Sequence, residues 1–329
     1  MTSIEISAPA KVNLFFKILS KRRDSYHNIL TLFERISLAD TITISKRKSG
    51  VSLKSDKLIT ADHKDNLAYK AAELLLKHSR IRSGVSVYIK KRIPIASGLG
   101  GGNSDAASVL MGINKLYNLR IPKPELMKLA LKLGADVPFF ILEEPFAVAR
   151  SVGEALEPVN LKLRPWHIIV YSGKKTSTRD MYEAFDAVKM GSVLKGRKGK
   201  KTSDLALTLR QGSRSSTERF KASKCLTSEG GDDKIQPPLK YSMDFESLEA
   251  LLYNDLEDVA VSKDTVIDNT IQRLASSLGR KAILSGSGPS VFCLCRTRKE
   301  AIKYRKRLFD TVPANELTGW QVFIAKTEG

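Results

Sequence analysis

Four of the five residues at positions 98 to 102 are glycine, and the segment that follows them has a helical pattern. Glycine lets the backbone approach a ligand closely and adopt positive φ angles. The first turn of a helix offers unpaired N–H groups and a partial positive charge. Together these features predict a cradle for an anion such as a chain of phosphates. The residues expected to form it are Pro94, Ile95, Ala96, Ser97, Gly98, Leu99, Gly100, Gly101, Gly102, Asn103 and Ser104.

The glycine-rich stretch fits neither of two common nucleotide-binding motifs. The chain contains no GxxxxGK[ST] sequence, and Asn103 replaces the third glycine of a dinucleotide fingerprint. Ser104 or Asp105 is expected to cap the following helix, and the Ser104 hydroxyl is close enough to reach a phosphate or its metal ion. The alternative is a tight loop whose glycines serve packing alone.

Two further segments carry polar side chains at notable positions. Asp136 lies in a tight turn between a helix-ending glycine and a proline, where the simplest interpretation is that it caps a short helix. Lys11 and Asn13 share the polar face of an alternating segment at 10–19. A single lysine in such a strand is ordinarily solvated.

Strands and helices alternate along most of the chain, which predicts an α+β fold. Alternation at 10–19 puts Val12, Leu14, Phe16 and Ile18 on one face of a strand. Other strands are expected at 41–46, 85–93, 166–172, 281–295 and 320–326. Apolar residues at helical spacing predict helices at 65–79, 104–118, 123–134, 179–189, 244–260, 264–278 and 298–310. We place a soft boundary near residue 160, which gives domains at 1–160 and 161–329.

The composition indicates a globular protein in a reducing compartment. The chain has 329 residues, of which 42% are hydrophobic, so it is long enough for one large domain or two ordinary ones. No apolar run approaches the roughly 18 residues that cross a bilayer, and the first residues do not resemble a signal peptide. The three cysteines are scattered, and neither they nor the four histidines have zinc-ligand spacing. We therefore expect a cytoplasmic protein without a membrane partner.

The net charge of +20 is unevenly distributed. Residues 189 to 224 hold eleven lysines and arginines but only two acidic residues, and this stretch is also rich in glycine and serine. It is typical of a mobile surface insertion, at about 189–240, with one short helix near 205–209. The alternative is an arm for nucleic acid or an acidic partner. Phe220 is the one aromatic residue among the basic ones, which argues against a base-stacking platform.

Four segments in order resemble the GHMP kinase superfamily. The glycine-rich stretch, "PIASGLGGGNS", is similar to its phosphate loop, P-x-x-x-G-L-G-[SG]-[SG], with Asn103 where serine is usual. "SAPAKVNLFFKILSKRRDSYHNILTLF" and "LGADVPFF" resemble the branch that acts on 4-diphosphocytidyl-2-C-methyl-D-erythritol, with Ser25 where that branch has glycine. "SGSGPSVFCL" resembles the C-terminal glycine motif. The resemblance implies two domains, the first like domain 2 of ribosomal protein S5 and the second a ferredoxin-like α/β sandwich.

The resemblance also implies roles for individual residues. It makes Asp136 the base for the substrate hydroxyl and Lys11 its partner, which keeps the carboxylate ionised and steadies developing charge. Asn13 would hydrogen-bond the polyol. Asn66 and Lys91 match positions that line the adenine pocket in the superfamily.

A second group of residues would recognise a cytosine base by the same resemblance. Tyr26 would stack on the ring and His27 would hydrogen-bond its edge. "KKTSTRDMYEAF" is similar to a segment in which Thr178 would hold a phosphate or hydroxyl and Tyr182 would complete the stack. On sequence alone, Tyr26 and His27 are more simply a packed tyrosine and a surface histidine.

The implied activity is phosphorylation of the 2-hydroxyl of 4-diphosphocytidyl-2-C-methyl-D-erythritol by ATP with Mg²⁺, a step of the non-mevalonate route to isoprenoid precursors. The Ser104 hydroxyl is the expected protein ligand of this metal ion. One alternative is another GHMP kinase that acts on homoserine, mevalonate or a sugar, which would leave Tyr26, His27 and Tyr182 without a base to bind. The other is a nucleic-acid-binding protein on the same scaffold, although nucleic acid is not the expected partner.

Overall fold

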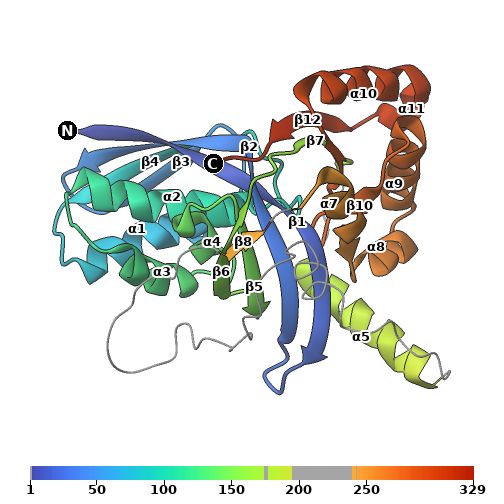
Figure 1. Ribbon diagram of the computed structural model, residues 1–329. Coiled ribbons are helices and arrows are strands. Elements are labelled where there is room, and N and C mark those ends of the chain that lie inside the picture. The colour runs from blue at the N-terminus through green and yellow to red at the C-terminus, as the bar shows by residue number, and fades with distance from the viewer. Residues whose placement is uncertain (1, 174–176, 195–238, 242) are drawn as a thin grey trace.

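The computed structural model describes residues 2–173, 177–194, 239–241 and 243–329 (Figure 1). The expected short helix near 205–209 and most of the basic insertion at 189–240 lie outside these residues. Two β-sheets, each covered by helices, make up the described part of the chain (Figure 1). Within it, no helix combines the length and the apolar character needed to span a membrane.

The first sheet is built around a long antiparallel pair, β1 (Ser3–Lys21) and β2 (His27–Arg47). The strand expected at 10–19 is thus the distal part of β1, and the one expected at 41–46 is the end of β2. The other strands of this sheet are β3 (Val51–Ser55), β4 (Gly84–Lys90), β5 (Phe146–Ser151), β6 (Ala155–Leu161), β8 (Leu239–Tyr241) and β9 (Tyr253–Asn254). The sheet runs β3-β4-β2-β5-β6-β8, and β1 pairs with both β2 and β9.

Four helices pack on one face of the first sheet (Figure 1). They are α1 (Leu67–His78), α2 (Gly101–Leu116), α3 (Lys123–Leu131) and α4 (Val137–Leu142), and a short 3₁₀ turn, η1 (His63–Asp65), precedes α1. Helix α2 packs against β1 and β2, and α1 packs against α2, β3 and β4. Ala71 and Leu75 of α1 and Ala106 and Leu110 of α2 are fully buried. This close packing fixes the start of α2 relative to the strands.

The second sheet is antiparallel and has the order β10-β11-β7-β12. Its strands are β7 (Trp166–Tyr171), β10 (Ala282–Leu284), β11 (Val291–Cys295) and β12 (Gln321–Lys326). The helices of this half are α5 (Thr178–Leu194), α7 (Phe245–Leu251), α8 (Glu257–Lys263), α9 (Thr265–Leu278), α10 (Arg298–Thr311) and α11 (Ala314–Leu317). The single helix expected at 244–260 is wrong, because β9 divides it into α7 and α8 to pair with β1.

The two halves share contacts that cross the expected boundary near residue 160. Strand β6 ends at Leu161 and β7 opens the second sheet, yet β8 and β9 return to the first. At the junction, the side chain of Glu34 in β2 is fully buried against that of His167 in β7, with 3.0 Å between Oε2 and Nε2. The Thr327 hydroxyl donates a hydrogen bond to Glu34 Oε1 over 2.6 Å. The boundary itself stays a prediction.

Candidate active site

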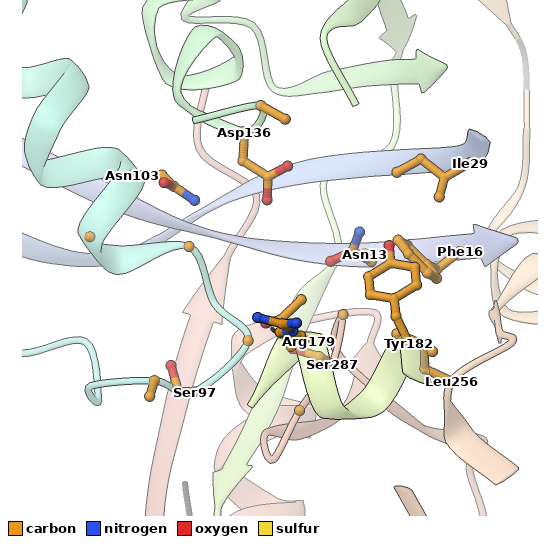
Figure 2. A pocket seen from close by; sticks show the side chains of 18 of the residues that line it. Asn13, Phe16, Ile29, Ser97, Asn103, Asp136, Arg179, Tyr182, Leu256 and Ser287 are labelled. Carbon is orange, nitrogen blue, oxygen red and sulfur yellow. Dashed lines mark hydrogen bonds between the residues drawn. The ribbon is translucent and has the colours of Figure 1, made fainter. Parts of the chain in front are cut away.

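A cavity of about 970 Å³ opens between the two halves of the molecule (Figure 2). Its walls come from the glycine-rich loop at 94–103, the polar face of β1, the tip of the β1–β2 hairpin, the turn before α4 and the first turns of α5. The second glycine-rich loop, at 286–288, completes it. Segments far apart in the sequence therefore meet around one space.

The two glycine-rich loops pack directly against each other. A Cβ atom on Gly98, whose φ is +78°, would lie 2.3 Å from the carbonyl oxygen of Ser285. Ser290 N–H donates to Ser97 O over 3.2 Å, which ties the loops together. On the other side, a Cβ atom on Gly100 at φ +72° would meet the Lys11 and Phe140 side chains at 3.0 Å. Glycine is required here because the left-handed backbone lies in close contact with its neighbours.

Helix α2 begins at Gly101 directly after this loop, with Gly100 in the N-cap position. No side chain in the described chain caps its first turn, so the expected capping by Ser104 or Asp105 is wrong; the helix starts before either residue. Gly100 to Asn103, at the start of this helix, line the cavity. Uncapped N–H groups with the helix dipole behind them form a favourable site for phosphate.

Lys11 is buried at the centre of the cavity wall. Its Nζ lies 3.5 Å from Asp136 Oδ2 and donates a hydrogen bond to Asn13 Oδ1. Burial lowers the pKa of Lys11, although the charge of Asp136 opposes this shift. Asn13 in turn donates to Thr31 Oγ1 over 2.8 Å, and the Thr31 hydroxyl donates to the carbonyl of Phe15. This chain of contacts holds both side chains in one orientation.

Asp136 occupies the N-cap position of α4 but makes no capping hydrogen bond to that helix, all of whose residues are described. Its carboxylate instead points into the cavity, across from Arg179 and Ser287 (Figure 2). The side chain is 28% exposed. The geometry therefore brings Lys11, Asn13 and a solvent-accessible carboxylate together, an arrangement able to take a proton from an alcohol.

Lys91 lies beneath the start of α2 and also lines the cavity. Its ammonium is held between two buried carboxylates, Asp40 and Asp105, with 2.9 Å to Asp105 Oδ2. Burial raises the pKa of Asp105 to about 7 even though Lys91 opposes the rise. Asp40 also accepts a hydrogen bond from Ile93 N–H over 2.8 Å, so the cluster anchors the strand that leads into the glycine-rich loop.

We expect Asp105→Asn to remove a pH dependence of stability. The unfolded chain releases this proton near pH 4 and the folded protein near pH 7, so the folded state binds more protons between them. Wild-type stability should therefore fall as the pH rises through this window, by on the order of 1 kcal/mol per pH unit. Urea unfolding of both proteins at pH 5 and pH 8 measures the difference. Equal slopes in the two proteins would contradict the assignment.

The far end of the cavity lies between the β1–β2 hairpin tip and α5. The Tyr26 side chain is 66% exposed at this tip. The His27 ring is buried and stacks on the Tyr182 ring with centroids 4.8 Å apart. The Thr178 and Ser287 hydroxyls are 2.9 Å apart, which joins the start of α5 to the second glycine-rich loop.

Most of the predicted site residues line this cavity, but three do not. Leu99 is buried in the core, and its carbonyl accepts a hydrogen bond from Lys11 N–H over 2.9 Å. Asn66 caps α1 through a hydrogen bond from Ala68 N–H. Ser104 is fully buried behind the loop. The predicted residues that do line it are Lys11, Asn13, Tyr26, His27, Lys91, Pro94, Ile95, Ala96, Ser97, Gly98, Gly100, Gly101, Gly102, Asn103, Asp136, Thr178 and Tyr182.

The sequence did not indicate the role of Asn254 in shaping the cavity. Its side-chain amide donates to the carbonyls of Leu284 (2.9 Å) and Gly286 (2.8 Å), and its Oδ1 accepts from Leu256 N–H. Asn254 thereby fixes the second glycine-rich loop against β9. The sequence predicted a continuous helix at 244–260 here, and the partners of Asn254 lie about 30 residues away in the chain.

The residues around Ser104 fit a metal ion in part. The Ser104 hydroxyl is buried and has no hydrogen-bond partner in the described chain, so its oxygen is available as a ligand. Among residues 2–173, 177–194, 239–241 and 243–329, no cluster of three acidic, histidine or cysteine side chains has the geometry of a metal site. A Mg²⁺ ion here would take most of its ligands from phosphate oxygens.

Comparison with known proteins agrees with this geometry. The family model described as GHMP kinases N terminal domain matches residues 66–144, and the one described as GHMP kinases C terminal matches residues 239–313. The 4-diphosphocytidyl-2-C-methyl-D-erythritol kinase of Alkaliphilus metalliredigens is 32% identical over 89% of this chain and 88% of its own length. That of Pelobacter propionicus is 33% identical over 99% of this chain and 100% of its own length.

Solved structures extend the comparison to the fold. A crystal structure of 4-(cytidine 5'-diphospho)-2C-methyl-D-erythritol kinase matches with a TM-score of 0.70 and 29% identity, over 99% of this chain and all of the other. Mevalonate kinase from L. major, in complex with R-mevalonate, has the same fold at a TM-score of 0.70 and 15% identity, over 99% and 97% of the two chains. The expected two-domain α+β architecture is thereby confirmed. The chain belongs to the 4-diphosphocytidyl-2-C-methyl-D-erythritol kinase family of the GHMP kinases.

Proposed function

We propose that this enzyme transfers the γ-phosphoryl group of ATP to the 2-hydroxyl of 4-diphosphocytidyl-2-C-methyl-D-erythritol, in the non-mevalonate route to isoprenoid precursors. The observation that carries the proposal is the Lys11–Asp136 pair, 3.5 Å apart, beside an uncapped helix start that follows a glycine-rich loop. An acceptor for the alcohol proton and a phosphate site thus share one cavity. The identity of the substrate is inferred from the name of the family to which the chain belongs.

The reaction requires positioning more than covalent chemistry. The N–H groups at 98–103 hold the triphosphate, and Asp136 accepts the proton of the 2-hydroxyl as its oxygen bonds to the γ-phosphorus. ADP leaves with the electrons of the broken P–O bond. The Lys11 ammonium keeps Asp136 ionised in the ground state and offsets negative charge on the transferred group. Asn13 fixes Lys11 and is within reach of the polyol.

Mg²⁺ is expected to accompany ATP, and the Ser104 hydroxyl is the protein group that would hold it. When bound, the ion would neutralise charge on the phosphates. The base of the substrate would lie at the hairpin tip, with Tyr26 and Tyr182 as stacking partners, His27 at its edge and Thr178 at the phosphates. The buried, thiol-bearing Cys293 and Cys295 are consistent with action in the reducing cytoplasm.

Substrate competition tests this proposal. ADP release is measured with the cytidyl substrate, with R-mevalonate and with homoserine at equal concentrations. We expect kcat/KM to favour the cytidyl compound by at least about 10³, because only that compound offers a base to the aromatic end of the cavity. Preference for mevalonate or homoserine would overturn the substrate assignment and leave the fold unaffected.

A further inference from the structure

Asp186 of α5 joins both strands of the β1–β2 hairpin at its tip. One carboxylate oxygen, Oδ1, lies 2.8 Å from His27 Nε2. The other, Oδ2, accepts a hydrogen bond from Lys21 Nζ over 2.7 Å. Figure 1 shows α5 beside the distal end of the hairpin. All three side chains line the cavity.

The contact with Asp186 decides which nitrogen of His27 carries a proton. Although burial opposes it, hydrogen bonds from Lys21 and His27 lower the pKa of Asp186, so the carboxylate is ionised at neutral pH. An ionised carboxylate only accepts hydrogen bonds. His27 Nε2 must therefore carry the proton, and a neutral ring then has a lone pair on Nδ1. The hydrogen bond between the ring and Asp186 is made through Nε2, which leaves Nδ1 for a ligand.

Lys21 holds the carboxylate that contacts His27. Its Nζ lies 2.7 Å from Asp186 Oδ2, while Oδ1 lies 2.8 Å from His27 Nε2, and the His27 side chain is only 6% exposed. The two contacts fix the orientation of the carboxylate, so Oδ1 stays turned toward Nε2.

We propose that Asp186 is a positioning residue that holds His27 as the Nε2-protonated tautomer, so that Nδ1 accepts a hydrogen bond from the amino group of the substrate's base. This inference rests on the proposed function. The stack with Tyr182 keeps the ring plane fixed at the aromatic end of the cavity. An exocyclic amino group, as in cytosine, donates to Nδ1. A carbonyl in the same place, as in uracil, would bring two lone pairs together.

The alternative is that Asp186 merely attaches α5 to the hairpin. Other contacts also hold this helix, since Met181 is 2% exposed and Lys263 Nζ donates to the carbonyl of Asp180 over 3.1 Å. If Asp186 had only this structural role, its substitution would lower the stability of the protein or change the kinetics with a cytidyl and a uridyl substrate equally. If Asp186 controls the tautomer, its substitution changes the preference for one of these two substrates over the other.

The test uses Asp186→Asn, whose amide either accepts from Nε2–H or donates to Nε2 and so no longer selects one tautomer. Asp180→Asn, the same substitution on an exposed part of α5, is the control. Kinetics are measured with the cytidyl substrate and its uridyl analogue. Long-range ¹⁵N–¹H correlation spectra of labelled wild-type and variant proteins give the protonated nitrogen of His27, assigned by comparison with His27→Gln.

We expect wild-type His27 to be neutral with its proton on Nε2. In Asp186→Asn, the cytidyl-over-uridyl preference should fall by at least about tenfold through KM, with kcat and the KM for ATP within about threefold of wild type. Asp180→Asn should keep the wild-type preference. A wild-type His27 protonated on Nδ1, or an unchanged preference in Asp186→Asn, would overturn the proposal.

The spectra also separate this proposal from the assignment of the substrate. If the wild-type enzyme does not use the cytidyl compound, the proposed function fails. The protonated nitrogen of His27 and its response to Asp186→Asn are measured without any substrate. These two measurements show, whatever the substrate is, whether Asp186 determines which nitrogen of His27 carries the proton.

Discussion

Asp136→Asn should lower kcat by at least about 10², the usual contribution of a positioned general base. The asparagine keeps the size of the side chain but cannot accept the alcohol proton. It also removes the carboxylate 3.5 Å from the buried Lys11 ammonium, whose pKa burial already lowers, so less of Lys11 stays charged. Both effects act on the transferred phosphoryl group. Steady-state ADP release with saturating ATP and cytidyl substrate measures the loss.

Binding measurements show whether Asp136→Asn acts on chemistry alone. The triphosphate site is made by backbone N–H groups of the glycine-rich loop, so the Kd for an ATP analogue should stay within about threefold of wild type. Asp180→Asn, the same substitution on the surface of α5, should keep wild-type kcat. Undiminished turnover in Asp136→Asn would remove Asp136 from the role of base.

The sequence alone predicted much of the fold, because most signals for it are local. The alternation at 10–19 correctly placed Lys11 and Asn13 on a common face, and the helices expected at 65–79 and 104–118 are present as α1 and α2. What it could not supply is strand order. The return of β9 to pair with β1 joins Tyr253 to Phe15, more than 200 residues apart in the chain, and it divides the helix expected there. Such pairing depends on tertiary contacts that a local pattern does not contain.

The same division applies to the site. The glycine-rich loop was predictable because glycine tolerates positive φ at close contact. Asp136 was expected from its neighbours only to cap a short helix, and the resemblance to the GHMP kinases supplied its role as base. Asp186 and Asn254 had no local signal. Asp186 acquires its importance from His27, 159 positions away, and Asn254 from carbonyls about 30 positions away. Lys11 and Lys91 are buried, although the sequence alone suggests a solvated side chain for a single lysine. Their burial is explained by carboxylates that only the folded structure brings next to them.

Gly98→Ala is expected to damage the phosphate site without touching a catalytic side chain. Alanine at φ +78° is strained, and its Cβ would lie 2.3 Å from Ser285 O and 3.0 Å from both N and O of Gly288. These atoms belong to backbone, which does not move aside cheaply. The two glycine-rich loops must therefore separate, and the N–H groups that hold the triphosphate lose their alignment. We expect the KM for ATP to rise at least about tenfold and stability to fall by about 2–4 kcal/mol.

Gly279→Ala separates the strain of the backbone from the collision between the loops. Gly279 ends α9 at φ +62°, and a Cβ atom there would have no neighbour within 4 Å in the described structure. Its substitution should cost only the left-handed strain, about 1 kcal/mol, and leave the KM for ATP unchanged. ATP titrations and urea unfolding of both variants give the comparison. If Gly98→Ala behaved like Gly279→Ala, contact between the two loops would not be what shapes the phosphate site, because the strain of a positive φ angle would account for the whole effect.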